Sequence, residues 1–334
     1  MKIFTSNNPN VTLKEMVRDI TEFGKPANSR NGMTLSYDEP VCIRHVNPAH
    51  RVIWLKSRNA NPFFHLFEFV WMLAGRNDVR TLSAFNANMK SYSDDGEIFN
   101  APYGYRLRKH FGIDQLKSVI EQLKKDPNSR QAVALLWDSK DLVKQTKDKA
   151  CNLELVFKLR DTGKLDMTVF NRSNDLIWGA LGANLVHMSL FHEYVATELG
   201  VPMGVYEQIS NCMHVYIDGL PGDIYRAILN QRDEGEVYCG YYPCDSSPSM
   251  KGIDEDVEDL FYHIGNCDTV IDMASGFMQS YRSEFFEKLF IPMMLVYLFH
   301  KLKRDDVAMQ ILVGSEIPED WKRASHNWLE LRRH

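Results

Sequence analysis

The spacing of hydrophobic and polar residues predicts a β-hairpin near the middle of the chain. Hydrophobic residues alternate with polar ones from Cys151 onward, and again over residues 165–170. Residues 161–163 (Asp-Thr-Gly) lie between the two runs and are typical of a turn. A glycine-containing loop follows, and then a helical spacing of hydrophobic residues over about 185–199.

Helical spacing also occurs in both outer parts of the chain. After residue 220 the pattern is mostly helical, with a loop over 240–256. A continuous hydrophobic run over 132–137 predicts a buried strand. The expected helices cover residues 11–24, 62–75, 114–124, 284–302 (interrupted by Pro292) and 319–332.

Composition excludes several classes of function. A formal net charge of −5 over 334 residues gives no basic surface for a nucleic-acid backbone, although a few arginines can still bind a small anion. The six cysteines have neither CxxC pairs nor zinc-site spacing, and we expect a reducing compartment. No hydrophobic run is long enough for a membrane span, and the N-terminus lacks the core of a signal peptide. We therefore expect a cytoplasmic enzyme that uses no metal.

Cys151 is a candidate nucleophile. A single cysteine is more often a small buried hydrophobic residue, but Arg172 follows 21 residues later across one hairpin. Strand pairing would bring the two together, and an arginine beside a thiol lowers its pKa and favours the thiolate. Arg172 and Ser173 also offer a charged fork and a hydroxyl to a phosphate.

Three further charged residues are candidates for function, and two of them, Glu68 and Arg30, have two interpretations each. Glu68 lies in the hydrophobic run over 62–75, where it either faces water or is buried with a raised pKa suited to proton transfer. Arg30 lies in a polar, glycine-containing loop, where it either binds an oxyanion or is solvated on a surface turn. Arg130 precedes the strand over 132–137 and stands at its entrance.

Taken in order from about residue 11 to 220, these motifs resemble the thymidylate synthase and pyrimidine-nucleotide hydroxymethylase family. The resemblance implies that Cys151 is the nucleophile, with Glu68 and Tyr103 (in Pro102-Tyr103-Gly104) transferring protons. The resemblance also implies residues that bind the substrate or the folate. The substrate-binding residues would be Arg30, Arg130, Arg172, Ser173, Asn184, His214 and Tyr216, and the cofactor-binding residues would be Asp175 and Gly179.

The sequence departs from the family pattern at several places. Lys149-Ala150 replaces the usual Pro-Pro before the nucleophile, and Gln131 replaces the second arginine of the strand-entrance pair. The loop that leads to Asn184 is one residue longer than usual. The absent Pro-Pro, the Arg-Ser-Asn-Asp motif over 172–175 and the His-Val-Tyr segment over 214–216 look closer to phage-type hydroxymethylases than to ordinary thymidylate synthases. The family does not account for the long tail after residue 220.

The resemblance implies an α+β, thymidylate synthase-like fold: a large mixed β-sheet flanked by helices, with residues 1–220 as the catalytic core and 221–334 as a helical C-terminal part of the same domain. It implies a homodimer in which Arg130 reaches the phosphate in the other subunit. The expected reaction is hydroxymethylation of carbon 5 of dUMP or dCMP through a covalent cysteine adduct, with 5,10-methylenetetrahydrofolate. The alternatives are a thymidylate synthase that makes dTMP and a non-catalytic nucleotide-binding relative. Family members that bind uracil usually have an amide at the base-binding position, so Asn184 favours dUMP. A side-chain amide can also flip, however, and can then match either base.

Overall fold

The computed structural model describes residues 1–231, 247–265 and 267–332. Residues 240–246 of the loop expected over 240–256, together with Cys239 and Cys244, lie outside the described residues. The described remainder begins without regular structure at residue 247 and is already helical from Ile253. The four cysteines within the described ranges are free thiols. No helix among these residues is long and apolar enough to cross a membrane.

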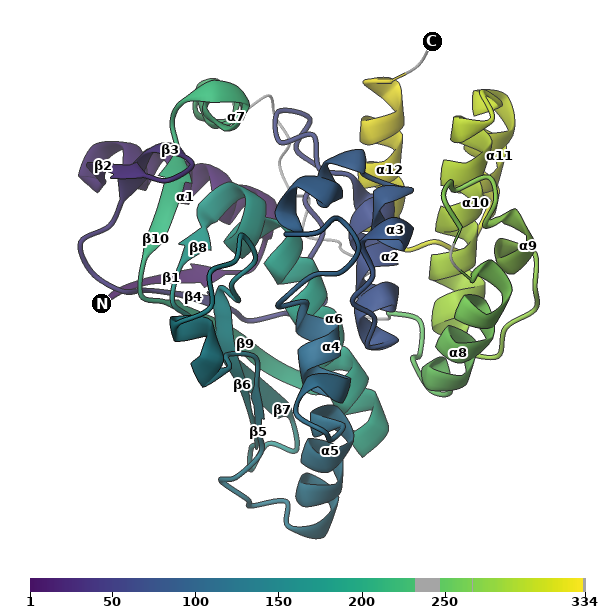
Figure 1. The fold of residues 1–334 in the computed structure, drawn as a ribbon, viewed down its shortest axis with the longest axis horizontal. Coiled ribbons are helices and arrows are strands. Elements are labelled where there is room, and N and C mark those ends of the chain that lie inside the picture. The colour runs from purple at the N-terminus through teal and green to yellow at the C-terminus, as the bar shows by residue number, and fades with distance from the viewer. Residues whose placement is uncertain (232–246, 266, 333–334) are drawn as a thin grey trace.

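The described residues form two β-sheets (Figure 1). The larger sheet is mixed, because β1 pairs in parallel with β4 and β7 with β9, whereas the other neighbours are antiparallel. Its order is β1 (Lys2–Ser6), β4 (Val41–His45), β9 (Met203–Ser210), β7 (Leu165–Asn171), β6 (Asn152–Leu159) and β5 (Val133–Leu135). The smaller sheet has the order β2 (Lys25–Ser29), β3 (Gly32–Ser36), β10 (Met213–Tyr216) and β8 (Asn174–Asp175).

The helices surround these sheets, and most of those expected are confirmed within a few residues. The α-helices are α1 (Pro9–Phe23), α2 (Pro62–Leu73), α3 (Val79–Ser83), α4 (Tyr103–Tyr105), α5 (Gln115–Lys125), α6 (Asn184–Leu199), α7 (Gly219–Asn230), α8 (Ile253–Ile264), α9 (Ala274–Phe277), α10 (Ile291–Lys301), α11 (Asp305–Gly314) and α12 (Glu319–Glu330). Shorter or wider helical turns are η1 (Ala87–Tyr92), η2 (Arg106–His110), η3 (Ser139–Leu142), η4 (Leu176–Ala183) and η5 (Phe285–Phe290).

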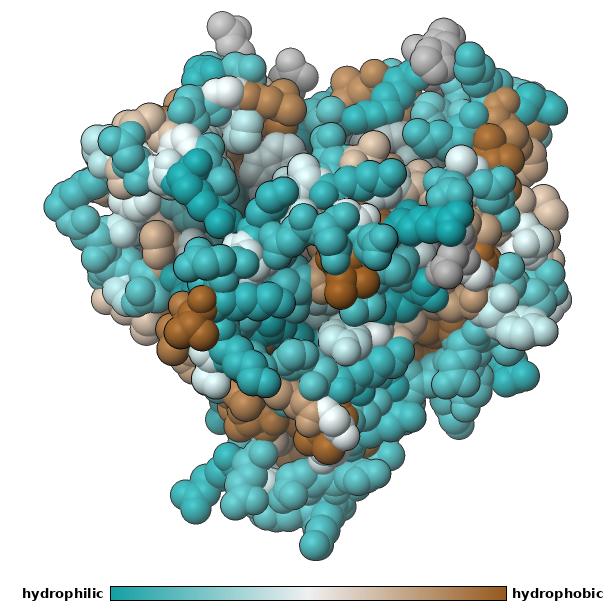
Figure 2. Space-filling view, in the orientation of Figure 1, coloured by the Kyte–Doolittle hydropathy of each residue, from teal (hydrophilic) through white to brown (hydrophobic). Residues whose placement is uncertain are grey.

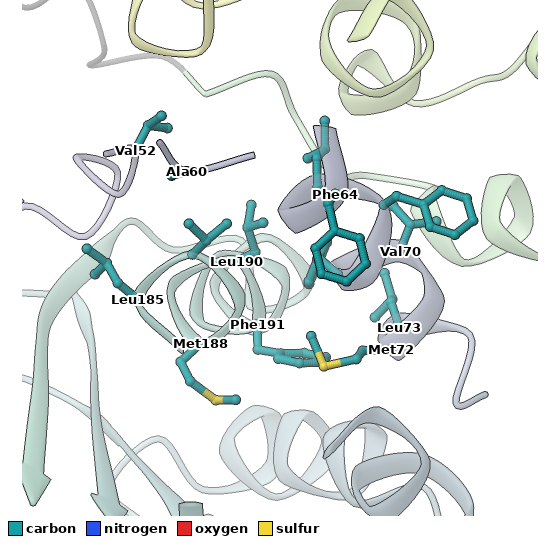
Figure 3. Packing of buried hydrophobic residues seen from close by; sticks show 14 of the residues in the cluster. Val52, Ala60, Phe64, Val70, Met72, Leu73, Leu185, Met188, Leu190 and Phe191 are labelled. Atoms are coloured by element: carbon teal, nitrogen blue, oxygen red, sulfur yellow. The ribbon is translucent and has the colours of Figure 1, made fainter. Parts of the chain in front are cut away.

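Helices α2 and α6 pack together at the centre of the molecule (Figure 3). Hydrophobic side chains of both helices interdigitate, and the rings of Phe69 and Phe191 meet edge to face with centroids 5.3 Å apart. Asn61 caps α2 by accepting from the Phe64 N–H, and Pro62 occupies its first turn. This packing fixes which polar side chains of α2 and α6 can face each other.

The C-terminal helices share the hydrophobic cluster with α2. Phe63 of α2 stacks on Tyr297 of α10 at 5.3 Å and meets Trp328 of α12 at 5.5 Å. In Figure 1 these helices lie on the side of α2 opposite the sheets. We therefore propose that residues 221–334 belong to the same domain as the rest.

The sequence predicts a buried strand over 132–137, and this prediction is wrong for one face of β5, which is exposed. Val133 and Leu135 are 38% and 44% exposed, whereas Ala134 between them is buried. The reason is that β5 is the edge strand of the larger sheet, next to β6 alone. Figure 2 shows brown, hydrophobic atoms on the lower part of the molecule, where β5 and β6 lie in Figure 1.

Candidate active site

The β6–β7 hairpin brings Cys151 and Arg172 together, as its pattern predicts. Asn152 pairs with Asn171, and the Arg172 N–H donates to the Cys151 carbonyl at 2.9 Å. The Arg172 guanidinium donates to the carbonyls of Ala150 at 2.8 Å and Lys149 at 3.1 Å. Its Nη2 then lies 3.6 Å from the Cys151 Sγ, so the backbone around the thiol holds the positive charge beside it.

Burial raises the pKa of the Cys151 thiol, which corrects the expectation of a net lowering. Arg172 and Arg30 act in the expected direction, but desolvation and the nearby Asp148 carboxylate outweigh them. The two guanidiniums are therefore the groups that stabilise a thiolate here. Arg30 is held in range because its Nη2 donates to the Lys147 carbonyl at 3.0 Å.

Of the two environments that the sequence allows for Glu68, the structure favours the desolvated one, since its side chain is 17% exposed in the wall of a cavity. Burial raises its pKa to about 8. Nε2 of His187, on α6, lies 3.4 Å from Oε2 of Glu68 and 3.1 Å from the His65 carbonyl. Burial also lowers the pKa of His187 to about 3, so this imidazole is neutral. The contact between Glu68 and His187 thus joins two groups that are uncharged at neutral pH, and a carboxyl in this state can both give and take a proton.

Tyr103 lies next to the thiol at the start of α4. Burial raises the pKa of its phenol, the Cys151 thiol acts in the same direction, and the backbone amide of Asn152 opposes both. Gly104 places this turn against α2, because a Cβ at position 104 would lie 1.9 Å from the Met72 carbonyl oxygen. The glycine therefore allows α4 to approach α2 closely enough to hold Tyr103 beside Cys151.

The smaller sheet places Asp175 beside His214, since β8 and β10 pair in parallel with these residues in register. One carboxylate oxygen of Asp175 accepts from the N–H groups of Ile177 and Trp178 at the start of η4. The other, Oδ2, is buried without a hydrogen-bond partner among the described residues. Burial opposes the charged form of His214, but the Cys212 thiol and Asp175 raise its pKa overall.

Tyr216 follows two residues after His214 on the same side of β10, with ring centroids 5.3 Å apart. Its hydroxyl accepts from Asn31 Nδ2 at 3.4 Å. Ser173 is near as well, because the side chains of His214 and Ser173 both lower the pKa of Cys212. Polar groups of the smaller sheet thus lie beside the loop that follows β7.

A cavity of about 220 Å³ opens beside Glu68, Tyr103 and Asn184. Its wall combines polar residues of α2, α4 and α6 with hydrophobic ones, among them Glu68, Tyr103, Asn184, His187, Trp71 and Phe99. Asn184 is half-buried there at the start of α6. The described residues contain no cluster of His, Cys, Asp and Glu that could hold a metal ion. A hydrophobic wall with a few convergent polar groups is typical of a site for a small organic molecule.

Comparison with known proteins assigns the family. A sequence model described as "Thymidylate synthase" matches residues 12–235. The chain belongs to the thymidylate synthase family. It is 38% identical over 344 aligned residues to the Deoxyuridylate hydroxymethyltransferase of Pseudomonas phage M6, covering all of this chain and 95% of that protein. The protein of the same name from Bacillus phage SP01 is 41% identical over 267 residues, with 76% of this chain and 68% of that one covered. That of Delftia phage PhiW-14 is 27% identical over 205 residues, 58% of this chain and 56% of that one.

Arg130, which the thymidylate synthase pattern predicts to bind substrate, lies away from the other predicted substrate-binding residues. Val133 pairs with Val156 and the strands are antiparallel, so Arg130 is level with Leu159 at the far end of β6. Leu159 is eight residues after Cys151, a distance of about 26 Å along a strand. Arg130 is exposed there and does not reach the site of its own subunit.

The structure adds residues that the sequence did not single out. His187 contacts Glu68, and Asn174 accepts from Asn184 Nδ2 at 3.0 Å. A lone histidine in a hydrophobic helix and an asparagine within the Arg-Ser-Asn-Asp motif gave no signal of their own. Gly179 approaches this pair, since a Cβ there would lie 2.4 Å from Asn174 Oδ1. The cofactor contact expected of Gly179 stays a prediction.

Proposed function

We propose that this protein is a deoxyuridylate hydroxymethyltransferase, which adds a hydroxymethyl group to carbon 5 of dUMP with 5,10-methylenetetrahydrofolate as donor. The observation that carries the proposal is the full-length similarity to the phage M6 protein of that name. The geometry around Cys151 supports it, because a thiol, a proton-transferring carboxyl and a phenol adjoin one cavity or its border. The cytoplasmic location expected from the sequence stays a prediction.

Arg30, Arg172 and Ser173 would hold the phosphate of dUMP, and His214 and Tyr216 the sugar hydroxyl. Support comes from the guanidinium of Arg172 beside Cys151 and from the position of β10 next to β8. A phosphate on two arginines places the base near the thiol. Sγ of Cys151 then adds to carbon 6, and carbon 5 becomes the nucleophile that forms the new carbon–carbon bond.

Glu68 acts twice in this scheme. With a pKa of about 8 its carboxyl carries a proton at neutral pH, which it donates to the base as Cys151 adds. Tyr103, whose hydroxyl lies near Cys151, assists removal of the proton from carbon 5 through water. Loss of the carbon 5 proton would accompany release of tetrahydrofolate, which leaves an exocyclic methylene on the nucleotide. The resulting Glu68 carboxylate then accepts a proton from the water whose hydroxyl adds to this methylene. As that water adds, the bond between Sγ and carbon 6 breaks and the thiolate is restored.

The residues present fit a folate donor. The unpartnered buried Oδ2 of Asp175 would accept a hydrogen bond from an N–H of its pterin ring. Asp175 caps the N-terminus of η4, and the last residue of η4, Ala183, lines the cavity together with Trp71. When bound, 5,10-methylenetetrahydrofolate supplies the one-carbon unit at the oxidation level of formaldehyde.

A homodimer would complete the site. Arg130 is too far from its own Cys151 but is exposed at the edge of the larger sheet, so Arg130 of the partner subunit would bind the phosphate. The exposed hydrophobic side chains of Val133 and Leu135 lie on the same strand and would be covered in such a dimer. Because Gln131 replaces the second arginine, each phosphate would be bound by one arginine of the partner subunit instead of two.

Mass analysis of the products from dUMP, dCMP and CMP tests the proposal. We expect dUMP to gain one CH₂O unit. A gain of CH₂, with the absorbance of dihydrofolate, would instead indicate a thymidylate synthase. Binding of dUMP without any product would indicate the non-catalytic alternative. The grouping of Cys151, Glu68 and Tyr103 argues against that alternative, because a protein that only binds the nucleotide needs no nucleophile and no proton carrier.

A further inference from the structure

The amide of Asn184 is the first member of a buried chain of amides. Its Nδ2 donates to Oδ1 of Asn174 at 3.0 Å. Asn174 is 2% exposed, and its own Nδ2 faces Oε1 of Gln208 at 3.4 Å and Oγ of Ser210 at 3.3 Å. In each step a nitrogen of one side chain meets an oxygen of the next, so the chain has a direction.

The chain ends on a group that cannot reverse. Nε2 of Gln208, which is fully buried on β9, donates to the Ala180 carbonyl at 2.9 Å and to Nε2 of His45 at 2.8 Å. A backbone carbonyl only accepts. Burial lowers the pKa of His45 to about 3, so this ring is neutral and its Nε2 can accept. If Gln208 flipped, its Oε1 would face the Ala180 oxygen with no proton between them.

This end point fixes every amide before it. With Gln208 Oε1 directed at Asn174, Asn174 must present its nitrogen there and its oxygen to Asn184. Asn184 must then keep Nδ2 toward Asn174, and its Oδ1 keeps one position in the cavity. If Asn184 flipped alone, its Oδ1 would face Oδ1 of Asn174. Avoiding this clash would require Asn174 and Gln208 to flip as well, and the Ala180 carbonyl prevents the flip of Gln208. Gly179 leaves the room for this pair, since a Cβ there would lie 3.2 Å from Asn184 Nδ2.

We infer that Gln208 and Asn174 are positioning residues that set the base specificity of the enzyme, by holding the Asn184 amide in one orientation so that it binds uracil and rejects cytosine. Uracil offers an N–H and a carbonyl where cytosine offers a ring nitrogen and an amino group, so one fixed amide matches only one of them. That uracil is the matching base rests on the proposed function.

Equilibrium binding of dUMP and dCMP, measured by calorimetry without folate, tests this inference independently of turnover. Gln208→Met keeps the size of the side chain and removes the donor to Ala180. Ser210→Ala is the matched control on the same strand, because it removes the other partner of Asn174 Nδ2 and leaves Gln208 in place. Asn174→Ala is a second variant that frees Asn184 directly, should Gln208→Met fold poorly.

We expect the wild type and Ser210→Ala to bind dUMP at least about tenfold more tightly than dCMP, and Gln208→Met and Asn174→Ala to lose about tenfold of that ratio. The change should come from weaker dUMP and equal or tighter dCMP binding, whereas general damage would weaken both. An unchanged ratio in both variants would overturn the inference even if hydroxymethylated product forms. A lost ratio with no product in the wild type would support the inference and refute the proposed reaction.

Discussion

Glu68 on α2 and His187 on α6 meet with 3.4 Å between Oε2 and Nε2, in the wall of the cavity beside Tyr103. The packing of α2 against α6, whose hydrophobic side chains Figure 3 shows, brings the two groups together. It also leaves the Glu68 carboxyl mostly buried. Neither partner is charged at neutral pH, because burial raises one pKa and lowers the other. The site therefore stores a proton on Glu68 where the proposed reaction needs one.

The first prediction concerns Glu68 and pH. The carboxyl keeps its proton in the folded protein up to about pH 8 but loses it near 4.5 when unfolded. The folded state thus binds more protons between these values, and its stabilisation is complete below about pH 4.5 and lost as pH rises through about 8. The free energy of unfolding, from denaturant titration, should fall across this window by up to about 1.4 kcal/mol per pH unit.

Glu68→Gln should remove this part of the pH dependence, because the amide does not titrate. It should also lower kcat by about 10²- to 10⁴-fold, since the proton carrier is lost. Glu121→Gln, an exposed residue of α5, is the matched control and should change neither quantity. An unchanged pH slope in Glu68→Gln would mean that Glu68 is ionised in the folded protein.

The second prediction concerns the nucleophile. Cys151→Ser should abolish turnover and leave the affinity for dUMP within about threefold, because a hydroxyl is a far weaker nucleophile at neutral pH and the arginines remain. Single-turnover kinetics and calorimetry measure the two effects. Cys267→Ser, at a cysteine between α8 and α9, should keep its activity. Turnover of Cys151→Ser at the rate of the wild type would rule out covalent catalysis by this residue.

The third prediction concerns shared sites. Arg130→Ala and Cys151→Ala should each be inactive or nearly so, whereas a mixture after subunit exchange should regain activity. In a hybrid dimer one site has an intact Cys151 and receives Arg130 from the partner subunit. Arg160 is another exposed arginine, in the turn between β6 and β7, and Arg160→Ala alone should keep full activity. If exchange is proven and no activity returns, Arg130 does not act across the dimer.

The fourth prediction concerns the base. Asn184→Asp should move the ratio of kcat/KM for dUMP and dCMP toward dCMP by about ten- to a hundredfold, because a carboxylate accepts from an amino group and must be protonated to donate. The carboxylate would also face Asn174 Oδ1, so dUMP turnover should fall more than dCMP turnover rises. Asn128→Asp, in an exposed turn, is the control. An unchanged ratio would show that Asn184 does not read the base.

The elements that local patterns specify could be predicted from the sequence. The hairpin that joins Cys151 to Arg172 depends on one turn, and its alternation needs no distant partner. The exposed face of β5 could not be predicted, because a run of hydrophobic residues does not show that a strand lies at a sheet edge. The same holds for the environment of Glu68, which depends on a helix more than 100 residues later.

The hydrogen-bond partners of Asn184 could not be predicted from the sequence for the same reason. Asn174 precedes it by ten residues, but Gln208 comes from another strand, and only the sheet order brings β9 next to β7. The raised pKa of Cys151 was missed for a related reason. The charge of Arg172 can be read from the sequence, whereas the desolvation that outweighs it depends on packing.

The central claim is that water, and no hydride, completes the reaction on dUMP. The most direct test is turnover of dUMP with 5,10-methylenetetrahydrofolate in water enriched in oxygen-18, followed by mass analysis of the nucleotide. We predict a product heavier by CH₂O that carries the heavy oxygen, with no dihydrofolate absorbance. A product heavier only by CH₂, formed together with dihydrofolate, would contradict the claim.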